Sequence, residues 1–230
     1  MAVSATSPSP SATDVEFFWD PMCPWAWLTS RWVVEVSKQT GLSVNWRFIC
    51  LRLLNEHKNY DSDFPDRYIA GHGSGLKLLR VAAAIRDHEG IEPMGALYTQ
   101  FGGDIHVHRR RKELTDHWEA GFPEYLRSVG IADKYIGEAN NDAWDKMLRS
   151  EKDEALSRTG DDVGTPIITF NRDGEQFSFF GPVISEVPSR ERAVPLWNAI
   201  CEIATMRGFA ELKRSSRGLP QLETSLDLEA

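Results

Sequence analysis

Cys23 is the residue with the clearest chemical potential in this chain of 230 residues. It follows an apolar, aromatic run, Val15–Trp19, that is typical of a buried strand and that stops at Asp20-Pro21. Pro24 comes next, and because proline is well suited to the first position of a helix, Cys23 is predicted to be the N-cap residue. The backbone N–H groups and the positive end of the helix dipole would then face its sulfur and lower its pKa from about 8.5 to roughly 3.5–7.5. The sequence therefore favours a reactive thiolate, with a buried core cysteine as the alternative.

The residue at position 26 limits what this cysteine can do. A dithiol redox helix has the spacing Cys-x-x-Cys, because the second sulfur resolves the mixed disulfide formed by the first. Here that position is Ala26. Cys50 and Cys201 fall on apolar faces of a predicted strand and a predicted helix, so both are interpreted as core residues. A disulfide on Cys23 is therefore expected to await an external thiol.

Two tryptophans and a basic run are further candidates for contacts with a substrate. Trp25 and Trp27 flank the cysteine, and we expect one of them to pack inside. Trp25 is then either an apolar wall for a substrate or a second core residue. The run Arg109–Lys112 is favoured as a solvated turn, with the alternative that it receives the carboxylate of an anionic thiol.

The remaining motifs argue against a metal or a nucleotide cofactor. His106 and His108, with His72 and His117 elsewhere, could form a metal cluster, but no nearby spacing resembles a closed zinc site. The run Gly71–Gly75 imitates a phosphate loop, yet it follows no predicted strand and lacks the Gly-Lys-Ser/Thr ending. The chain has no flavin or nicotinamide fingerprint either. We therefore expect no metal, flavin or nicotinamide.

Composition indicates a globular protein that keeps its thiols reduced. The chain is 41% hydrophobic and 26% charged, and its net charge of -8 argues against non-specific binding of nucleic acid. Three cysteines in this length are not a disulfide framework. The first residues lack the basic start and apolar stretch of a signal peptide, and no segment has the roughly 18 apolar residues of a membrane span. We expect a cytoplasmic location and no membrane partner.

The hydrophobic pattern predicts two halves of a sheet around a helical block. A strand at Val15–Trp19, a helix from Pro24 to about Thr40 and a strand at Val44–Cys50 form a β-α-β unit. Two further strands, Ile167–Phe170 and Gln176–Phe180, flank a turn and precede a last helix. From about residue 61 to residue 159 the periodicity is helical.

These elements predict an α/β fold with a large all-helical insertion. A sheet-containing domain would comprise residues 14–60 and 161–214, and an inserted helical domain residues 61–160. Residues 1–13 are expected to be a disordered tail and residues 215–230 a polar tail.

The pattern resembles the thioredoxin superfamily, and the helical insertion narrows the resemblance to DsbA-like proteins. Individual motifs are similar to those of one cytosolic group, the actinobacterial DsbA-family oxidoreductases described as mycothiol-dependent nitroreductases. The motifs that carry this resemblance, within about residues 15–214, are Phe18–Trp27, Thr29–Trp32, Leu54–Glu56, Gly102–His106 and Asp162–Pro166. Well-studied members carry a second cysteine where this chain has Ala26.

The resemblance implies a thioredoxin-like fold and roles for several residues. In such folds the proline at the position of Pro166 is cis and faces the active-site cysteine, so that the backbone of Thr165 can pair with a substrate; an ordinary proline at the start of a strand is the alternative. By motif match, Asn55, Tyr68 and His106 would line a cleft between sheet and helical block. For each of these three, a structural role is the favoured alternative. Residues 101–104, before Ile105-His106, are predicted to form a loop. Loops carry functional residues more often than helix faces do, so this segment is a candidate for function.

The sequence thus predicts a monothiol oxidoreductase that exchanges disulfides with a low-molecular-weight thiol, mycothiol being suspected, and that reduces disulfides or nitro compounds. Cys23 would be the catalytic residue. Pro24, Trp25 and Ala26, in the first turn of the helix that follows it, would contact the thiol. A kappa-type glutathione transferase or isomerase, which activates a bound thiol coenzyme, is one alternative. A non-catalytic binding module is another. The expected partner is a small thiol or disulfide, and a homodimer is compatible with the sequence.

Overall fold

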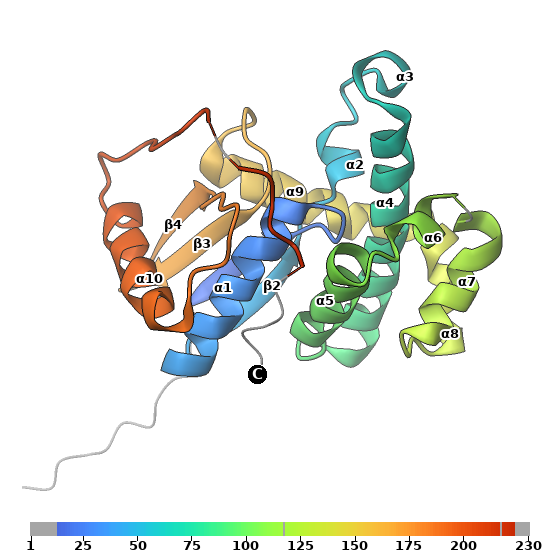
Figure 1. The fold of residues 1–230 in the computed structure, drawn as a ribbon, viewed down its shortest axis with the longest axis horizontal. Helices are drawn as coiled ribbons and strands as arrows, with labels where there is room; N and C mark the ends of the chain where they lie inside the picture. The colour runs from blue at the N-terminus through green and yellow to red at the C-terminus, as the bar shows by residue number, and fades with distance from the viewer. Residues whose placement is uncertain (1–12, 117, 217, 224–230) are drawn as a thin grey trace, which may run out of the picture.

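The computed structural model describes residues 13–116, 118–216 and 218–223, and Figure 1 shows its fold. The predicted tail over residues 1–13 therefore lies almost entirely outside the described residues, as does part of the predicted tail over residues 215–230. Within the described ranges, no helix is both long enough and apolar enough to cross a membrane.

Four strands form one mixed sheet in the order β2-β1-β3-β4. Strand β1 pairs in parallel with β2 and antiparallel with β3, and β3 pairs antiparallel with β4. The central position of β1 explains its mostly apolar sequence, because a strand covered on both faces carries few polar residues. The bounds of the strands are β1 (Val15–Trp19), β2 (Val44–Phe48), β3 (Ile167–Arg172) and β4 (Glu175–Phe180).

Helices cover both faces of this sheet. On one face lie α1 (Pro24–Thr40) and α10 (Arg190–Ala204), which the Trp32 indole joins by donating to the Ala193 carbonyl at 2.9 Å. On the other face lies α9 (Asp145–Thr159), whose Ala155 packs with Phe18 and Ile167 in a small apolar cluster. The sheet is therefore the middle layer of three.

The described chain between β2 and β3 is helical throughout, apart from its connecting loops. This confirms the predicted mixed α/β class with an inserted helical block. Figure 1 shows the block beside the sheet, with α4 as its long central helix, except for α9, which covers one face of the sheet. Its elements besides α9 are α2 (Leu51–Leu54), α3 (Tyr60–Asp63), α4 (Asp66–Glu89), α5 (Met94–Gly102), η1 (Gly103–Val107), α6 (Arg111–Asp116), α7 (Trp118–Ser128), α8 (Asp133–Ile136), η2 (Gly137–Asn140) and η3 (Asp142–Trp144).

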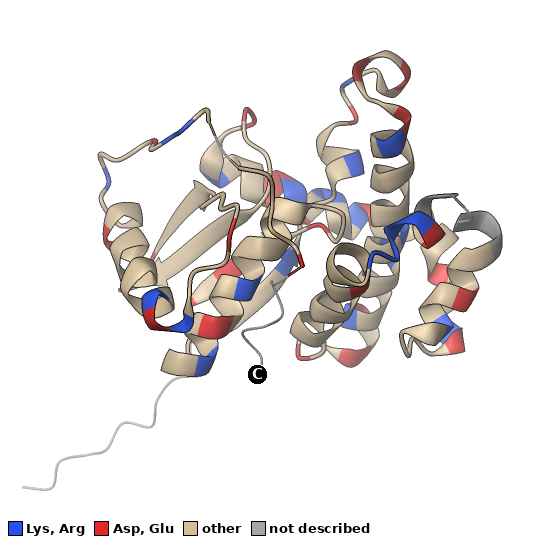
Figure 2. Ribbon diagram, in the orientation of Figure 1, with Lys and Arg blue, Asp and Glu red and all other residues tan. Residues whose placement is uncertain are grey.

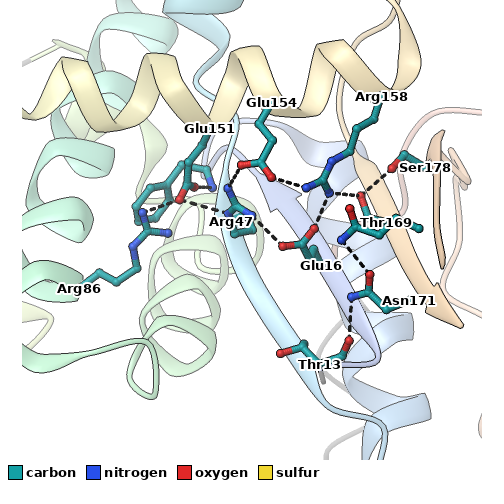
Figure 3. A network of polar contacts seen from close by, with 12 residues as sticks. Thr13, Glu16, Arg47, Arg86, Glu151, Glu154, Arg158, Thr169, Asn171 and Ser178 are labelled. Carbon is teal, nitrogen blue, oxygen red and sulfur yellow. Dashed lines mark hydrogen bonds and ion pairs between the residues drawn. The ribbon is translucent and has the colours of Figure 1, made fainter. Parts of the chain in front are cut away.

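A network of ion pairs joins α9 to the sheet and to α4 (Figure 3). Arg47 of β2 contacts Glu16 of β1 at 2.7 Å and Glu151 of α9 at 3.1 Å. The second carboxylate oxygen of Glu151 accepts the Phe48 N–H at 2.6 Å, and Arg86 of α4 reaches its first oxygen at 2.6 Å. The helical block is thereby fixed to β2 and, through Arg47 and Glu16, to β1, the strand that leads into Cys23.

Two local predictions are wrong. The second strand ends at Phe48, and Cys50 is the N-cap of α2 instead of a strand residue, although it is fully buried. The expected loop at residues 101–104 is helical, because α5 runs to Gly102 and continues as a turn of π-helix, η1. The loop was predicted because Gly102 and Gly103 are adjacent glycines, which often mark loops. A Cβ on Gly102 would lie 2.1 Å from the Trp27 ring, so this glycine permits close packing and does not mark a loop.

Candidate active site

Cys23 lies at the N-cap of α1, in the short loop that connects β1 to this helix. Its backbone is extended, with φ -83 and ψ 110, and Pro24 occupies the start of the helix. The Ala26 N–H donates to the sulfur at 3.4 Å. This is the placement expected from the sequence. The geometry aims the helix N-terminus at the thiol.

The expectation of a lowered pKa for Cys23 is wrong for this structure. Only 5% of the residue is exposed, and burial raises the pKa of the thiol to about 12. The N–H groups of Ala26 and Trp25 and the charge of Arg111 act in the opposite direction but do not offset the lost hydration. Cys23 is therefore a protonated thiol in this structure, and its sulfur lies 3.7 Å from the Thr165 carbonyl oxygen to which it donates.

Asp20, which was not among the predicted site residues, also acts on this thiol. Its carboxylate accepts the Met22 N–H and the Leu51 N–H, each at 2.8 Å, so it ties the loop before Cys23 to α2. The side chain is fully buried, and burial raises its pKa to about 6. The charge of the carboxylate contributes to the raised pKa of Cys23. A carboxylate directly after the aromatic end of a strand, Phe17–Trp19, is the sequence signal that could have identified it.

A cavity of about 1420 Å³ opens beside Cys23. Of the nine predicted site residues, all but Ala26 and Pro166 line this cavity. Those two residues are buried, and the peptide bond between Thr165 and Pro166 is cis. The predicted residues that line the cavity are Cys23, Pro24, Trp25, Asn55, Tyr68, His106 and Thr165.

Two histidines of the cavity wall are held neutral. The Nε2 atom of His106 lies 2.9 Å from the Pro21 carbonyl oxygen, and the ring stacks on Trp27. Burial lowers the pKa of His106 to about 3. His72 bonds to the Tyr60 hydroxyl through Nδ1 at 2.9 Å, and burial lowers its pKa to about 4. Both rings therefore act as neutral hydrogen-bonding groups at neutral pH.

Figure 2 shows the basic run in blue where the chain enters α6. The side chains of this run do not behave as a single solvated turn. Arg110 pairs with Glu113 at 3.0 Å, and Arg109 pairs with Glu223. Arg111 instead enters the cavity and is only partly exposed; within the described part of the chain it has no ion pair. Burial lowers the pKa of this guanidinium, and its charge lowers the pKa of Cys23 and of Asp20. The solvated interpretation is therefore wrong for Arg111.

The glycine-rich run that imitated a phosphate loop lies inside α4 and packs against this site. A Cβ on Gly75 would lie 2.9 Å from the Met22 side chain and 3.1 Å from an Asp20 carboxylate oxygen. A Cβ on Gly71 would lie 2.9 Å from the Arg111 guanidinium. The two glycines therefore let α4 approach the loop before Cys23 and leave room for Arg111.

Metal ligands do not gather in the described part of the chain, where no group of three or more His, Cys, Asp or Glu residues could hold an ion. His108 lies on the surface and pairs with Asp104 at 3.2 Å. His117, which the alternative metal cluster included, is outside the described residues.

Comparison with known proteins identifies the family. The family model described as mycothiol-dependent nitroreductase Rv2466c matches residues 22–214, so the chain belongs to this Rv2466c-like family. A Mycobacterium tuberculosis protein, the uncharacterized protein Rv2286c, is 27% identical over 205 residues, covering 88% of this chain and 82% of that protein.

Solved structures show the same fold. The cytosolic disulfide reductase DsbM from Pseudomonas aeruginosa is similar with a TM-score of 0.52 at 15% identity, over 83% of this chain and 99% of that one. Its structure with GSH gives a TM-score of 0.51 at 12% identity, over 82% and 98% of the two chains. The chain therefore has a DsbA-like thioredoxin fold, which confirms the resemblance drawn from its motifs.

Proposed function

We propose that this member of the Rv2466c-like family is a cytosolic monothiol oxidoreductase in which Cys23 exchanges disulfides with a low-molecular-weight thiol, mycothiol being the first candidate. One observation carries the proposal. A single cysteine caps α1 at the wall of a cavity large enough for a small thiol, and the position that would hold a second cysteine is Ala26. The mycothiol dependence in the name of the family supports this choice of thiol.

The exchange proceeds in two balanced steps. The Cys23 thiolate attacks one sulfur of a disulfide RS–SR, so that a Cys23–SR bond forms, the RS–SR bond breaks, and RS⁻ leaves and takes up the proton that Cys23 gave up. An external thiol then attacks the mixed disulfide, forms a new disulfide and returns Cys23 to the thiol form. With a nitro compound as acceptor, two thiols become one disulfide and the nitro group becomes a nitroso group and water.

The charges around Cys23 suggest how the thiol becomes reactive. Burial is the main cause of its raised pKa, so a substrate that brings polar groups and water into the cavity reduces the main barrier to ionisation. The helix N-terminus and Arg111 then favour the thiolate. The neutral rings of His72 and His106 add no repulsion to an incoming cation or anion.

Thr165 supports a substrate contact at the same place. Its hydroxyl is buried and has no hydrogen-bond partner among the described residues, and its carbonyl lies next to the Cys23 sulfur. An unpaired buried hydroxyl is costly unless a ligand or water satisfies it. We propose that it bonds to the thiol substrate, while Trp25, Asn55, Tyr68 and His106 form the wall against which the substrate lies.

A transferase or isomerase that activates the thiol of a bound coenzyme is the second candidate. The raised pKa of Cys23 favours it, because a protonated thiol is a weak nucleophile and the cavity could hold a coenzyme thiol instead. In that mechanism Cys23 forms no obligatory disulfide. A non-catalytic binding module needs no chemistry at Cys23 at all.

Intact mass spectrometry separates these functions. The protein is incubated with oxidised mycothiol, oxidised glutathione and oxidised bacillithiol in parallel, and the adduct on Cys23 that forms fastest identifies the thiol. Cys201→Ser, on α10, is the matched control and should form the same adducts. Cys23→Ser should abolish adducts and redox turnover. Turnover that survives Cys23→Ser would instead support the transferase, and ligand binding without any turnover would support the binding module.

A further inference from the structure

We propose that residues 218–223 form a strap that restricts Cys23 to small thiols and disulfides and excludes protein disulfides. The proposal rests on the monothiol function above and specifies its class of substrate. Figure 1 shows this segment, in dark red, passing the N-terminal end of α1 between the sheet and the helical block. It returns from the far end of the sequence to the helix that begins with Cys23.

The strap is attached on both sides of the active site. The Gln221 N–H donates to the Ser185 carbonyl at 2.8 Å, in the loop after β4, which belongs to the sheet half of the protein. The Glu223 carboxylate pairs with Arg109, which belongs to the helical block. The strap therefore spans the junction between the two halves.

The strap also forms part of the cavity that contains Cys23. Its residues Pro220 to Glu223 line this cavity, and Leu222 is partly buried against the hydrophobic core. Other leucines of the same tail behave differently, since Leu219 is 87% exposed and Leu212 is 82% exposed. The partly buried position of Leu222 is therefore a specific contact and does not reflect a general collapse of the tail.

This position has a steric consequence for disulfide exchange. Attack requires the incoming disulfide to align with the Cys23 sulfur, and only 5% of Cys23 is exposed. A small thiol or disulfide fits inside a cavity of about 1420 Å³ without moving the strap. A disulfide in a folded protein must bring its backbone up to the same sulfur, and the strap occupies part of that approach. The strap is thus a size filter.

The test compares small and large reagents at Cys23. Leu222→Ser/Glu223→Arg should release the strap, and Leu219→Ser, at an exposed position of the same segment, is the matched control. Each protein is treated with a dipyridyl disulfide and with a polyethylene-glycol pyridyl disulfide, and the rate of modification of Cys23 is measured by mass spectrometry of its peptide. The released variant should raise the ratio of the large-reagent rate to the small-reagent rate about tenfold, equivalent to about 1.4 kcal/mol. The control should keep the ratio of the natural protein.

An unchanged ratio in the released variant would overturn the proposal. If thermal unfolding shows that this variant does not fold, the charge reversal Glu223→Arg and the swap Arg109→Glu/Glu223→Arg replace it. The reversal should raise the ratio and the swap should restore it, whereas equal ratios in both would also overturn the proposal. Modification of Cys23 requires no thiol-dependent turnover. A strap effect without such turnover would therefore refute the monothiol function while leaving the strap in place.

Discussion

Arg111 is a cation that faces Cys23 without a paired carboxylate among the described residues. Its charge lowers the pKa of the thiol and should attract an anionic reagent more than a neutral one. We predict that Arg111→Gln slows the modification of Cys23 by iodoacetate several-fold more than its modification by iodoacetamide. The measurement is the rate of each reaction at constant pH and ionic strength.

Lys112 provides the control for this experiment, because it follows Arg111, lines the same cavity and is exposed. Lys112→Gln should change the ratio of the two rates less than Arg111→Gln does, since charges in contact with water are strongly screened. Equal changes in both variants would mean that Arg111 acts only as part of a diffuse positive surface.

At the scale of single residues, the position of Cys23 at a helix N-cap was predictable, but its electrostatics were not. The order strand, Cys23, Pro24, helix is local, and local rules were sufficient to place the cysteine at the N-cap. Its pKa depends on burial by segments far apart in the chain, together with the charge of Asp20, and no local pattern encodes that burial. Arg111 was assigned to a solvated turn for the same reason.

Helix α4 positions the active site through two glycines, and a third provides a comparison. A Cβ on Gly75 would press on Met22 and Asp20, whereas a Cβ on Gly73 would meet no atom within 4 Å. We predict that Gly75→Ala destabilises the protein by about 1–3 kcal/mol and alters the reactivity of Cys23, because overpacking forces neighbours to move. Gly73→Ala should stabilise the protein by roughly 0.5–1 kcal/mol, because it removes the flexibility of a helical glycine.

Urea unfolding and the alkylation rate of Cys23 test both substitutions. The two changes add the same methyl group to the same helix, so helix propensity alone predicts the same result for both. If Gly75→Ala and Gly73→Ala stabilise the protein equally and leave the reactivity of Cys23 unchanged, then close packing of α4 does not constrain the loop before Cys23.

Helix α9 depends on Glu151 for its attachment to the sheet and to α4 (Figure 3). This carboxylate bonds to Arg47, Arg86 and the Phe48 N–H, and only 10% of its side chain is exposed. Glu151→Ala should cost about 3–5 kcal/mol of unfolding free energy, because two poorly hydrated guanidinium groups lose a partner. The measurement is chemical unfolding.

Glu154 is the matched control for Glu151 on the same helix. It also pairs with Arg47, but 41% of its side chain is exposed, so Glu154→Ala should cost about 1 kcal/mol or less. If the two variants lose similar stability, the burial of the Glu151 network contributes nothing beyond an ordinary surface pair.

The elements themselves were largely predictable, and the exceptions share a cause. Strand β1 and helix α1 begin and end where the apolar pattern and Gly41 indicated, since Gly41 has the positive φ of a helix C-cap. The wrong loop prediction at Gly102 arose because glycine also permits close packing, as it does in the Gly71–Gly75 run inside α4. That function is visible only when the partner, Trp27 or Met22, is in place.

For the whole molecule, the free energy of unfolding should fall as the pH is lowered. Two buried histidines are neutral in the folded protein and take up protons more readily when it unfolds. The pKa values of His72 and His106 are lowered from 6.5 to about 4 and about 3, so the folded state binds fewer protons than the unfolded state. Their stabilisation is complete above pH 6.5 and is lost as the pH falls toward 4. Asp20 acts in the opposite sense between pH 6 and 4, because its pKa is raised from 3.8 to about 6. The net loss from pH 7 to pH 4 should be about 4 kcal/mol from these three groups.

The slope of stability against pH tests this account. His72→Gln should reduce the slope between pH 6 and 4.5 by about 1.4 kcal/mol per pH unit, the effect of one proton. Parallel curves for the natural protein and His72→Gln would contradict the neutral, buried assignment.

The distribution of thiols over the molecule gives the last prediction. All three cysteines are free: Cys50 is buried at the start of α2, and Cys201 lies on α10. Neither of these two residues lines the cavity of Cys23, and burial raises the pKa of both, so neither is placed to attack a mixed disulfide on Cys23. Resolution must then be bimolecular, and turnover should rise with the concentration of mycothiol or an equivalent thiol.

The substitution Ala26→Cys should convert this one-cysteine cycle into a dithiol cycle, and it therefore tests the mechanism. The new sulfur would lie one helical turn from Cys23, at the spacing of a dithiol motif, and should form an internal disulfide that reduces the dependence on small thiol. Turnover is measured against thiol concentration for both proteins, with Ala26→Ser as the control for the added polar atom. The natural protein and Ala26→Ser should both require the thiol. Full activity of the natural protein without any small thiol would show that the single-cysteine cycle is wrong, and the raised pKa of Cys23 would then point to the transferase.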